Sequence, residues 1–137
     1  MKMVYPVIFT QTKDRVLVEV PDMSILTEGN DLADAILMAR DAIGVKGIAM
    51  EDDGEKLPDA SNVYAIDLAA GVFKAEGKAI LSMVDVDFDE YRRRNDNKSV
   101  RRNVTLPNWL NREAEKEKIN VSKVLQEALM SRLGVYR

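Results

Sequence analysis

The 137-residue chain contains neither cysteine nor histidine. Without cysteine no disulfide framework can form, and without both residue types the usual transition-metal ligands and the commonest general base are missing. We therefore expect no metal, no cofactor and no catalytic residues, and so no enzyme. No stretch approaches the roughly 18 continuous apolar residues of a membrane-spanning helix, and the start of the chain does not resemble a secretory leader. A cytoplasmic protein without membrane contact is the simplest expectation.

Charge of one sign is also scarce in each half of the chain. Residues 1–91 hold 8 Lys and Arg against 18 Asp and Glu, a net charge of −10, whereas residues 92–137 hold 12 against 5, a net charge of +7. The overall charge of −3 hides this division. A shift of this kind favours two domains with different partners.

Residues 1–91 have the pattern of a small α+β domain. "MVYPVIF" from Met3 and "RVLVEV" from Arg15 predict an antiparallel hairpin, because the second run alternates strictly. Pro6 should lie at an edge or a bulge, where no ladder donor is needed. A helix should run from Asn30 or Asp31 toward Met50. "NVYAIDL" (62–68) and "KAILSMVDVDF" (78–88) are the next two predicted strands, so the expected order is ββαββ.

The segment "DEYRRRNDNKS" has no periodic apolar pattern. We interpret residues 92–98 as a linker, with Arg92, Arg93 and Arg94 as a solvated run rather than a specific contact. Residues 99–137 then form a second domain.

This second domain begins with a predicted strand, "SVRRNVTLP". Its alternation places Val100, Val104 and Leu106 on one face and Arg101, Asn103 and Thr105 on the other. Pro107 ends the strand and opens a short helix, in which Trp109 is interpreted as a packing residue. Ser122 is expected to cap a second helix with a wide apolar face that includes Leu125 and Leu129, and Gly134 is expected to end it.

A strand and two short helices of under roughly 40 residues rarely bury a core alone. A second copy solves this if two strands pair antiparallel across a twofold axis, with Val104, Leu106, Leu125 and Leu129 as the dimer core. The polar faces would then form a two-stranded ribbon, which fits the major groove of B-DNA. Arg101, Asn103 and Thr105 would face the bases, and Ser122 and Lys123 at the start of the second helix would meet phosphate.

Two sets of motifs carry a family resemblance. The pattern "RRNVTLPNWL…INVSKVLQEAL" resembles the ribbon-helix-helix (βαα) transcriptional repressors. "YPVIF", "VPD", "TEGNDLADAI", "KLPDAS" and "VDVDFDEYRRR" are similar to the HicB antitoxin domain, a degenerate RNase H-like sheet and helix. The resemblance implies a HicB-like toxin-binding domain at 1–91 and a DNA-binding, dimerising tail at 99–137.

The leading hypothesis is therefore a type II antitoxin that binds a HicA-like mRNA-cleaving toxin and represses its own operon by binding operator DNA as a homodimer or a higher even oligomer. An acidic domain suits this task, because a face that binds RNA is basic.

Two alternatives stay open. The chain could be a stand-alone ribbon-helix-helix regulator whose N-terminal domain senses a small molecule. Less favoured is an RNase H-like nuclease, which needs carboxylates that converge on two metal ions. Asp85 and Asp87 share a face of one strand, but Asp22 and Asp67 cannot be placed beside them from sequence, and solvated acids are the commoner outcome. Arg101, Asn103 and Thr105 could likewise be an outward face that only meets water.

Overall fold

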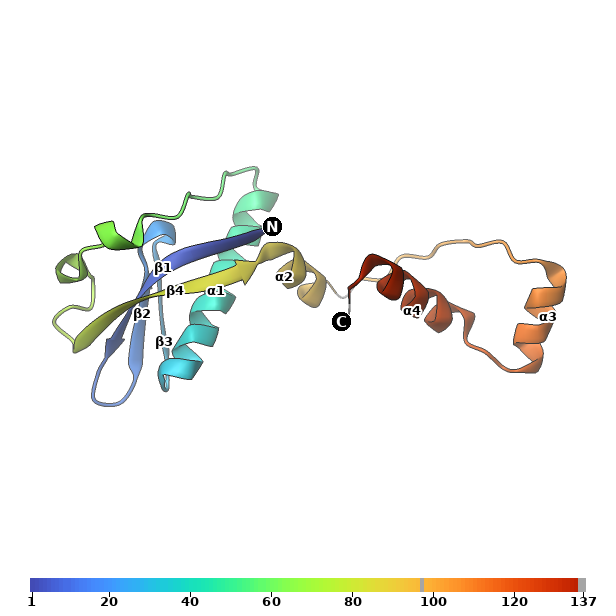
Figure 1. The fold of residues 1–137 in the computed structure, drawn as a ribbon, viewed down its shortest axis with the longest axis horizontal. Coiled ribbons are helices and arrows are strands. Elements are labelled where there is room, and N and C mark those ends of the chain that lie inside the picture. Colours follow the sequence, from blue (N-terminus) through green and yellow to red (C-terminus); the bar gives the residue numbers. More distant parts are fainter. Residues whose placement is uncertain (97, 136–137) are drawn as a thin grey trace. The chain divides into compact units, whose positions relative to one another are not determined.

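The computed structural model describes residues 1–96 and 98–135. The chain divides into two compact units, Met1–Asn95 and Asp96–Arg137. The first contains a mixed α+β fold and the second is helical, as Figure 1 shows.

A four-stranded antiparallel sheet forms the N-terminal unit. Its strands are β1 (Lys2–Gln11), β2 (Val16–Val20), β3 (Ile25–Gly29) and β4 (Lys78–Asp87), in the order β3-β2-β1-β4. The predicted hairpin is confirmed as β1 and β2. Val16, Val18 and Val20 are all buried, so the alternation in this strand did identify its inner face.

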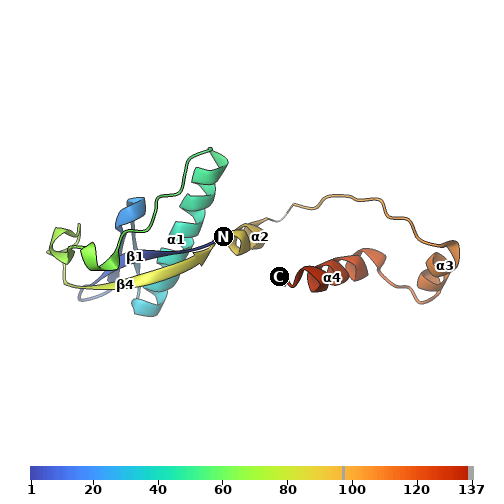
Figure 2. The same cartoon turned by 45° about the horizontal axis from the view of Figure 1, so that its top comes forward.

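Helix α1 (Leu32–Asp52) covers that inner face (Figures 1 and 2). Asp31 caps it, since its carboxylate accepts a hydrogen bond from the Asp34 N–H at 2.8 Å. Ala35, Ala39 and Ile43 lie on the buried side of the helix. They join the side chains from the inner face of the sheet in one hydrophobic core.

Pro6 lies in an inner strand, yet in the part of β1 that β2 does not reach. It is opposite Met83 of β4, and the first pair between β1 and β2 is Ile8–Glu19. The prediction of an edge strand or a bulge at Pro6 is therefore wrong, although no ladder donor is needed on the β2 side at this residue.

The predicted order ββαββ is wrong, and the observed order is βββαβ. The sequence predicted no strand at β3, because this strand is short and presents Leu26 and Glu28 outward at the sheet's edge. Residues 62–68 are not a strand. Asn62 and Asp67 accept hydrogen bonds from the N–H groups of Tyr64 and Ala69, which favours the two 3-10 turns η2 (Val63–Ala65) and η3 (Leu68–Ala70).

Residues 92–95, expected in the linker, instead complete helix α2 (Phe88–Asn95). This helix packs on α1 at two glycines. A Cβ on Gly44 would lie 2.7 Å from Cδ2 of Tyr91, and one on Gly47 would overlap the Phe88 ring. Tyr91 also donates a hydrogen bond of 2.6 Å to Asp41. The glycines that weaken α1 as a helix thus allow α2 to approach closely.

The C-terminal unit contains α3 (Asn108–Lys116) and α4 (Val121–Leu133). Gly134 ends α4 with φ of 68°, as predicted. Ser122 is not the cap of α4: the Asn120 side chain accepts the Lys123 N–H at 3.1 Å, and Ser122 lies one residue inside the helix. Residues 98–107 form no strand in this single chain, which contains no second strand to pair with them there.

Candidate functional site

The residues predicted to contact DNA bases lie on an exposed segment. Arg101, Asn103 and Thr105 are all exposed, and so are Val104 (51%) and Leu106 (36%), which were expected to point into a shared core. Residues 98–107 form neither a helix nor a paired strand. In the single chain, the predicted inner side chains are therefore as exposed as the predicted outer ones.

One groove in the C-terminal unit brings several predicted residues together. Its walls come from the segment after Ser99 and from α4, and they include Arg101, Ser122, Leu125 and Leu129. Asn103, Thr105, Lys123, Val104 and Leu106 are not among its lining residues. The backbone N–H of Lys123 is taken by Asn120, so it is not free to bind phosphate.

No side chain in residues 98–135 is buried. Large apolar side chains are exposed throughout this part of the chain: Val100, Val104, Leu106, Trp109, Leu110, Ile119, Val124, Leu129 and Leu133. A folded unit with so much exposed apolar surface and no core of its own has the composition of an interface. Trp109, interpreted above as a packing residue, is 65% exposed in the single chain.

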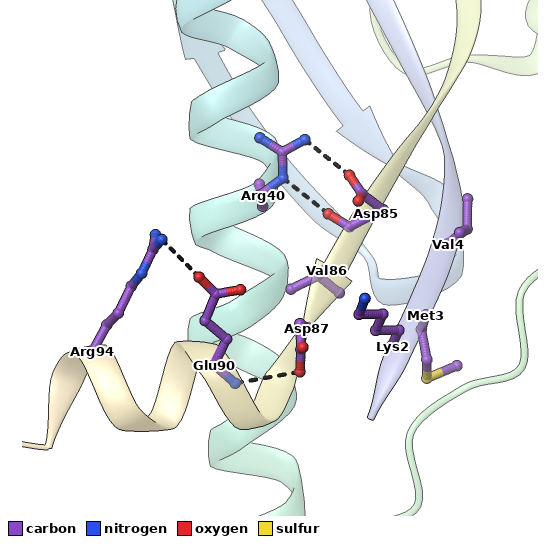
Figure 3. Close-up of a pocket in the computed structure, with 9 residues that line it drawn as sticks. All are labelled: Lys2, Met3, Val4, Arg40, Asp85, Val86, Asp87, Glu90 and Arg94. Carbon is purple, nitrogen blue, oxygen red and sulfur yellow. Dashed lines mark hydrogen bonds and ion pairs between the residues drawn. The ribbon is translucent and has the colours of Figure 1, made fainter. Parts of the chain in front are cut away.

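A second candidate site lies in the N-terminal unit, in an open pocket where β1, β4, α1 and α2 meet (Figure 3). Arg40 of α1 donates from Nε to the Asp85 backbone carbonyl at 2.9 Å and from a terminal nitrogen to the Asp85 carboxylate at 3.0 Å. The hydrogen bond from Arg40 holds the pKa of Asp85 below its ordinary value.

The other acidic side chains in this pocket, Asp87 and Glu90, are paired as well. Asp87 accepts hydrogen bonds from the N–H groups of Glu90 (3.3 Å) and Asp89 (3.1 Å), and the bond from Glu90 is the main reason that its pKa is lowered. Glu90 in turn forms an ion pair of 2.7 Å with Arg94. The carboxylates of this pocket are therefore held by hydrogen bonds and ion pairs within the N-terminal unit, which favours a structural role for them.

The four carboxylates weighed for a nuclease do not converge. Asp22 accepts hydrogen bonds from Ser61, Asp67 caps η3, and Asp85 is paired with Arg40. Within residues 1–96 and 98–135, no group of three or more Asp or Glu side chains could hold a metal ion. Nor does that part of the chain include a helix with the length and apolarity to cross a membrane.

Comparison with known proteins identifies the family. Residues 5–133 match the model of the HicB-like antitoxins of bacterial toxin-antitoxin systems, so the chain belongs to this family of antitoxins. No curated protein matches.

Solved structures agree in fold. A chain of a toxin-antitoxin complex from Streptococcus pneumoniae is 22% identical, with a TM-score of 0.61, over 96% of this chain and 99% of that one. The antitoxin HicB of Burkholderia pseudomallei is 24% identical, with a TM-score of 0.52, over 96% and 97%. A chain of a HicA3 and HicB3 toxin-antitoxin complex is 28% identical, with a TM-score of 0.51, over 62% and 99%.

Sequence reasoning missed the contacts of α2 with α1. Arg40, Asp41 and Tyr91 were not singled out, and only the spacing of Glu90 and Arg94, four residues apart, signalled a helix. With α2 included, residues 1–95 hold 11 Lys and Arg against 18 Asp and Glu, a net charge of −7, and residues 96–137 hold 9 against 5, a net charge of +4. The contrast in sign between the units remains.

Proposed function

We propose that the N-terminal unit of this HicB-like antitoxin binds and masks a HicA-like toxin. The observation that carries the proposal is a self-contained acidic unit with a net charge of −7 in a family of antitoxins. A toxin that cleaves mRNA needs a basic face for phosphates, and an acidic protein both attracts that face and occupies it. The structure 28% identical to this chain was solved as a HicA3 and HicB3 complex.

We further propose that the C-terminal unit binds the operator of its own operon as a dimer. Support comes from the nine exposed apolar side chains and from the unpaired segment after Ser99. Two such segments would pair antiparallel, which gives each the strand partner that a single chain lacks, and Val104, Leu106, Leu125 and Leu129 would become the shared core. Arg101, Asn103 and Thr105 of both copies would then line one ribbon in the major groove, with Ser122 and Lys123 near the phosphates.

Co-expression with the product of the adjacent gene tests the first proposal. The two proteins should co-purify, and residues 1–95 alone should still rescue growth from the toxin because this unit has its own core. The association rate should fall as salt is raised while the dissociation rate changes less, as for opposite charges that steer an encounter. A fragment that folds but fails to rescue growth would show that the tail is needed for neutralisation.

A titration on duplex DNA from the region upstream of the gene tests the second proposal. The full chain should prefer this DNA to a scrambled duplex, whereas residues 1–95 should bind neither. Equal affinity of the full chain for both duplexes at several salt concentrations would reduce the tail to a non-specific, phosphate-binding role.

A further inference from the structure

Residues 58–77, drawn mainly in green in Figure 1, lead from α1 to β4 and cover part of the sheet's outer face. Side chains alternate between the two faces of a strand, so Ile8 points away from the core that contains Val7 and Phe9. Ile8 is nevertheless only 4% exposed. Gly71 lies over it, because a Cβ on this glycine would be 3.7 Å from Ile8 Cδ1. We call residues 58–77 the strap.

Two carboxylates on the sheet side hold the strap in place. Asp22, in the 3-10 turn η1 (Pro21–Met23), accepts hydrogen bonds from the hydroxyl of Ser61 and from its N–H at 2.8 Å. Glu19 of β2 accepts a hydrogen bond from the Val72 N–H at 3.0 Å, through Oε1. The strap is therefore fixed at two points, and the space beneath it has defined walls.

A pocket of about 210 Å³ lies between the strap and the sheet. Ile8, Pro21 and Ile66 give it apolar surface. Glu19 and Asp67 give it two carboxylates. This combination of apolar walls and negative charge suits a ligand that is apolar along its length and cationic at its end.

Neither carboxylate has a cationic partner of its own. Asp67 Oδ1 accepts the Ala69 N–H at 2.9 Å, and Glu19 is bound only to the strap backbone. In the part of the chain that the structure describes, no lysine or arginine forms an ion pair with either. The pocket of Figure 3 differs, because Arg40 there already pairs with Asp85. The pocket under the strap thus offers charge that the chain itself leaves without a counter-ion.

We propose that this pocket receives a lysine or arginine side chain of the toxin. The methylene stem of such a side chain would lie against the apolar walls, and its charged end would meet Glu19 and Asp67. Residues 53–67 hold four Asp and Glu against one Lys, a net charge of −3, so the surroundings attract the same partner. The proposal rests on the proposed masking of a HicA-like toxin and assigns a place of contact to it.

Two exposed apolar side chains of the strap adjoin the pocket. Tyr64 is 95% exposed and precedes Ala65, which lines the pocket, and Val72 is 61% exposed and follows Gly71. Tyrosine is enriched among the residues that carry most of the binding energy of interfaces, and contacts around such residues exclude water. Tyr64 and Val72 would therefore pack on the toxin next to its basic side chain.

Calorimetric titration of the full chain with the purified product of the adjacent gene tests the charged contact. Glu19→Gln and Asp67→Asn remove a charge but keep an acceptor oxygen for the strap and for the η3 cap. Each should weaken binding about tenfold or more. Asp14→Asn is the matched control, because Asp14 is an exposed carboxylate between β1 and β2, and it should change the affinity by less than about threefold. All three variants should unfold at the wild-type temperature.

Gly71→Ala tests the shape of the pocket without a change in charge. The new methyl would lie 3.5 Å from Glu19 Oε1 and 3.7 Å from Ile8 Cδ1, and the φ of −63° at this residue accommodates alanine. We expect dissociation to be about fivefold faster or more, with an unchanged salt dependence of the association rate. Thermal unfolding checks that the methyl, 3.2 Å from the Leu68 carbonyl oxygen, leaves the strap in place.

Tyr64→Ala tests the apolar contact beside the pocket. It should weaken binding about tenfold or more, whereas Tyr64→Phe keeps the ring and should stay within about threefold of wild type. Leu37→Ala is the control, since Leu37 is a large apolar residue of α1 that is 61% exposed, and it should bind as wild type does. Tyr64→Ala should not alter the unfolding temperature, because the side chain packs on almost nothing in the free chain.

The outcomes separate this pocket from the proposed function. If wild type binds the toxin and Glu19→Gln, Asp67→Asn and Gly71→Ala all keep its affinity, the pocket is not the contact and the masking proposal stands. If wild type does not bind, both proposals fail. Double-mutant cycles with Glu19→Gln identify the toxin side chain: one lysine or arginine, changed to methionine, should show a coupling of about threefold or more. The absence of coupling to every basic residue of the toxin would overturn the inference.

Discussion

The two units of this antitoxin differ in how they achieve a core. In the N-terminal unit, α1 and the sheet bury fifteen apolar side chains in one cluster. In the C-terminal unit no described side chain is buried, and nine large apolar ones are exposed. The difference teaches that an apolar pattern in a sequence predicts which face of an element is apolar. It does not predict whether the same chain supplies the surface that buries this face.

The largest effect that this comparison predicts comes from Leu106→Asp. In the proposed tail dimer Leu106 lies in the shared core, where an unpaired carboxylate costs several kcal/mol, so this variant should neither dimerise through the tail nor bind the operator. The N-terminal unit should keep its thermal unfolding temperature and its ability to neutralise toxin, because its core lies elsewhere. Thr105→Asp is the control: one residue earlier and predicted on the outward face, it should abolish DNA binding but preserve the dimer. Sedimentation and an operator titration measure both properties.

The next-largest expected effect is on specific binding to operator DNA. In the proposed ribbon, Arg101→Ala and Asn103→Ala would each remove a base contact worth roughly 1 to 3 kcal/mol, counted twice in the proposed dimer. Specific affinity should fall strongly while weak affinity for scrambled DNA and toxin neutralisation remain.

Lys123→Ala is the contrasting variant. It should weaken binding to operator and scrambled DNA alike and make the dependence on salt shallower, because it would remove the proposed phosphate contact of the Lys123 side chain. If Arg101→Ala and Asn103→Ala both kept the wild-type preference for operator, the ribbon would not be the reading surface.

Sequence predicted well wherever a chemical feature acts locally. Alternation predicted β2, the helix expected from Asn30 or Asp31 toward Met50 is α1, and Gly134 predicted the end of α4. The predictions failed for elements that depend on contacts between residues far apart in the sequence. Strand β3 is defined by its pairing with β2, and α2 by the space that Gly44 and Gly47 leave on α1.

The candidate DNA-binding site could also be predicted only in part from the sequence. The residue types and their spacing are local, but the strand that would order Arg101, Asn103 and Thr105 needs a partner that the single chain does not provide. In the N-terminal pocket, Arg40 was not predictable as the partner of Asp85, because 45 residues separate them.

Gly47→Ala should destabilise the N-terminal unit even though it improves the helix. Alanine in place of glycine favours a helix by about 1 kcal/mol, whereas overpacking costs roughly 1 to 3 kcal/mol, and here the new methyl would overlap the Phe88 ring. We expect a net loss of roughly 1 to 2 kcal/mol in the free energy of unfolding. Val45→Ala, at an exposed position of the same helix, should be neutral or slightly stabilising. A more stable Gly47→Ala protein would mean that α2 does not dock there.

The smallest effect concerns the hydroxyl that joins α2 to α1. Burial, together with the hydrogen bond to Asp41, raises the pKa of Tyr91 to about 12 from an ordinary value of 10.0. The protonated form is therefore favoured by folding, and its contribution is complete below about pH 10 and lost as the pH rises through about 12. Because Tyr91 is only partly buried, we expect less than about 1 kcal/mol. Urea unfolding across this range should show a shallower loss of stability for Tyr91→Phe than for wild type. Tyr64→Phe, at a tyrosine that is 95% exposed, should follow wild type throughout. Identical alkaline profiles for all three proteins would show that the bond to Asp41 does not hold α2 in place in solution.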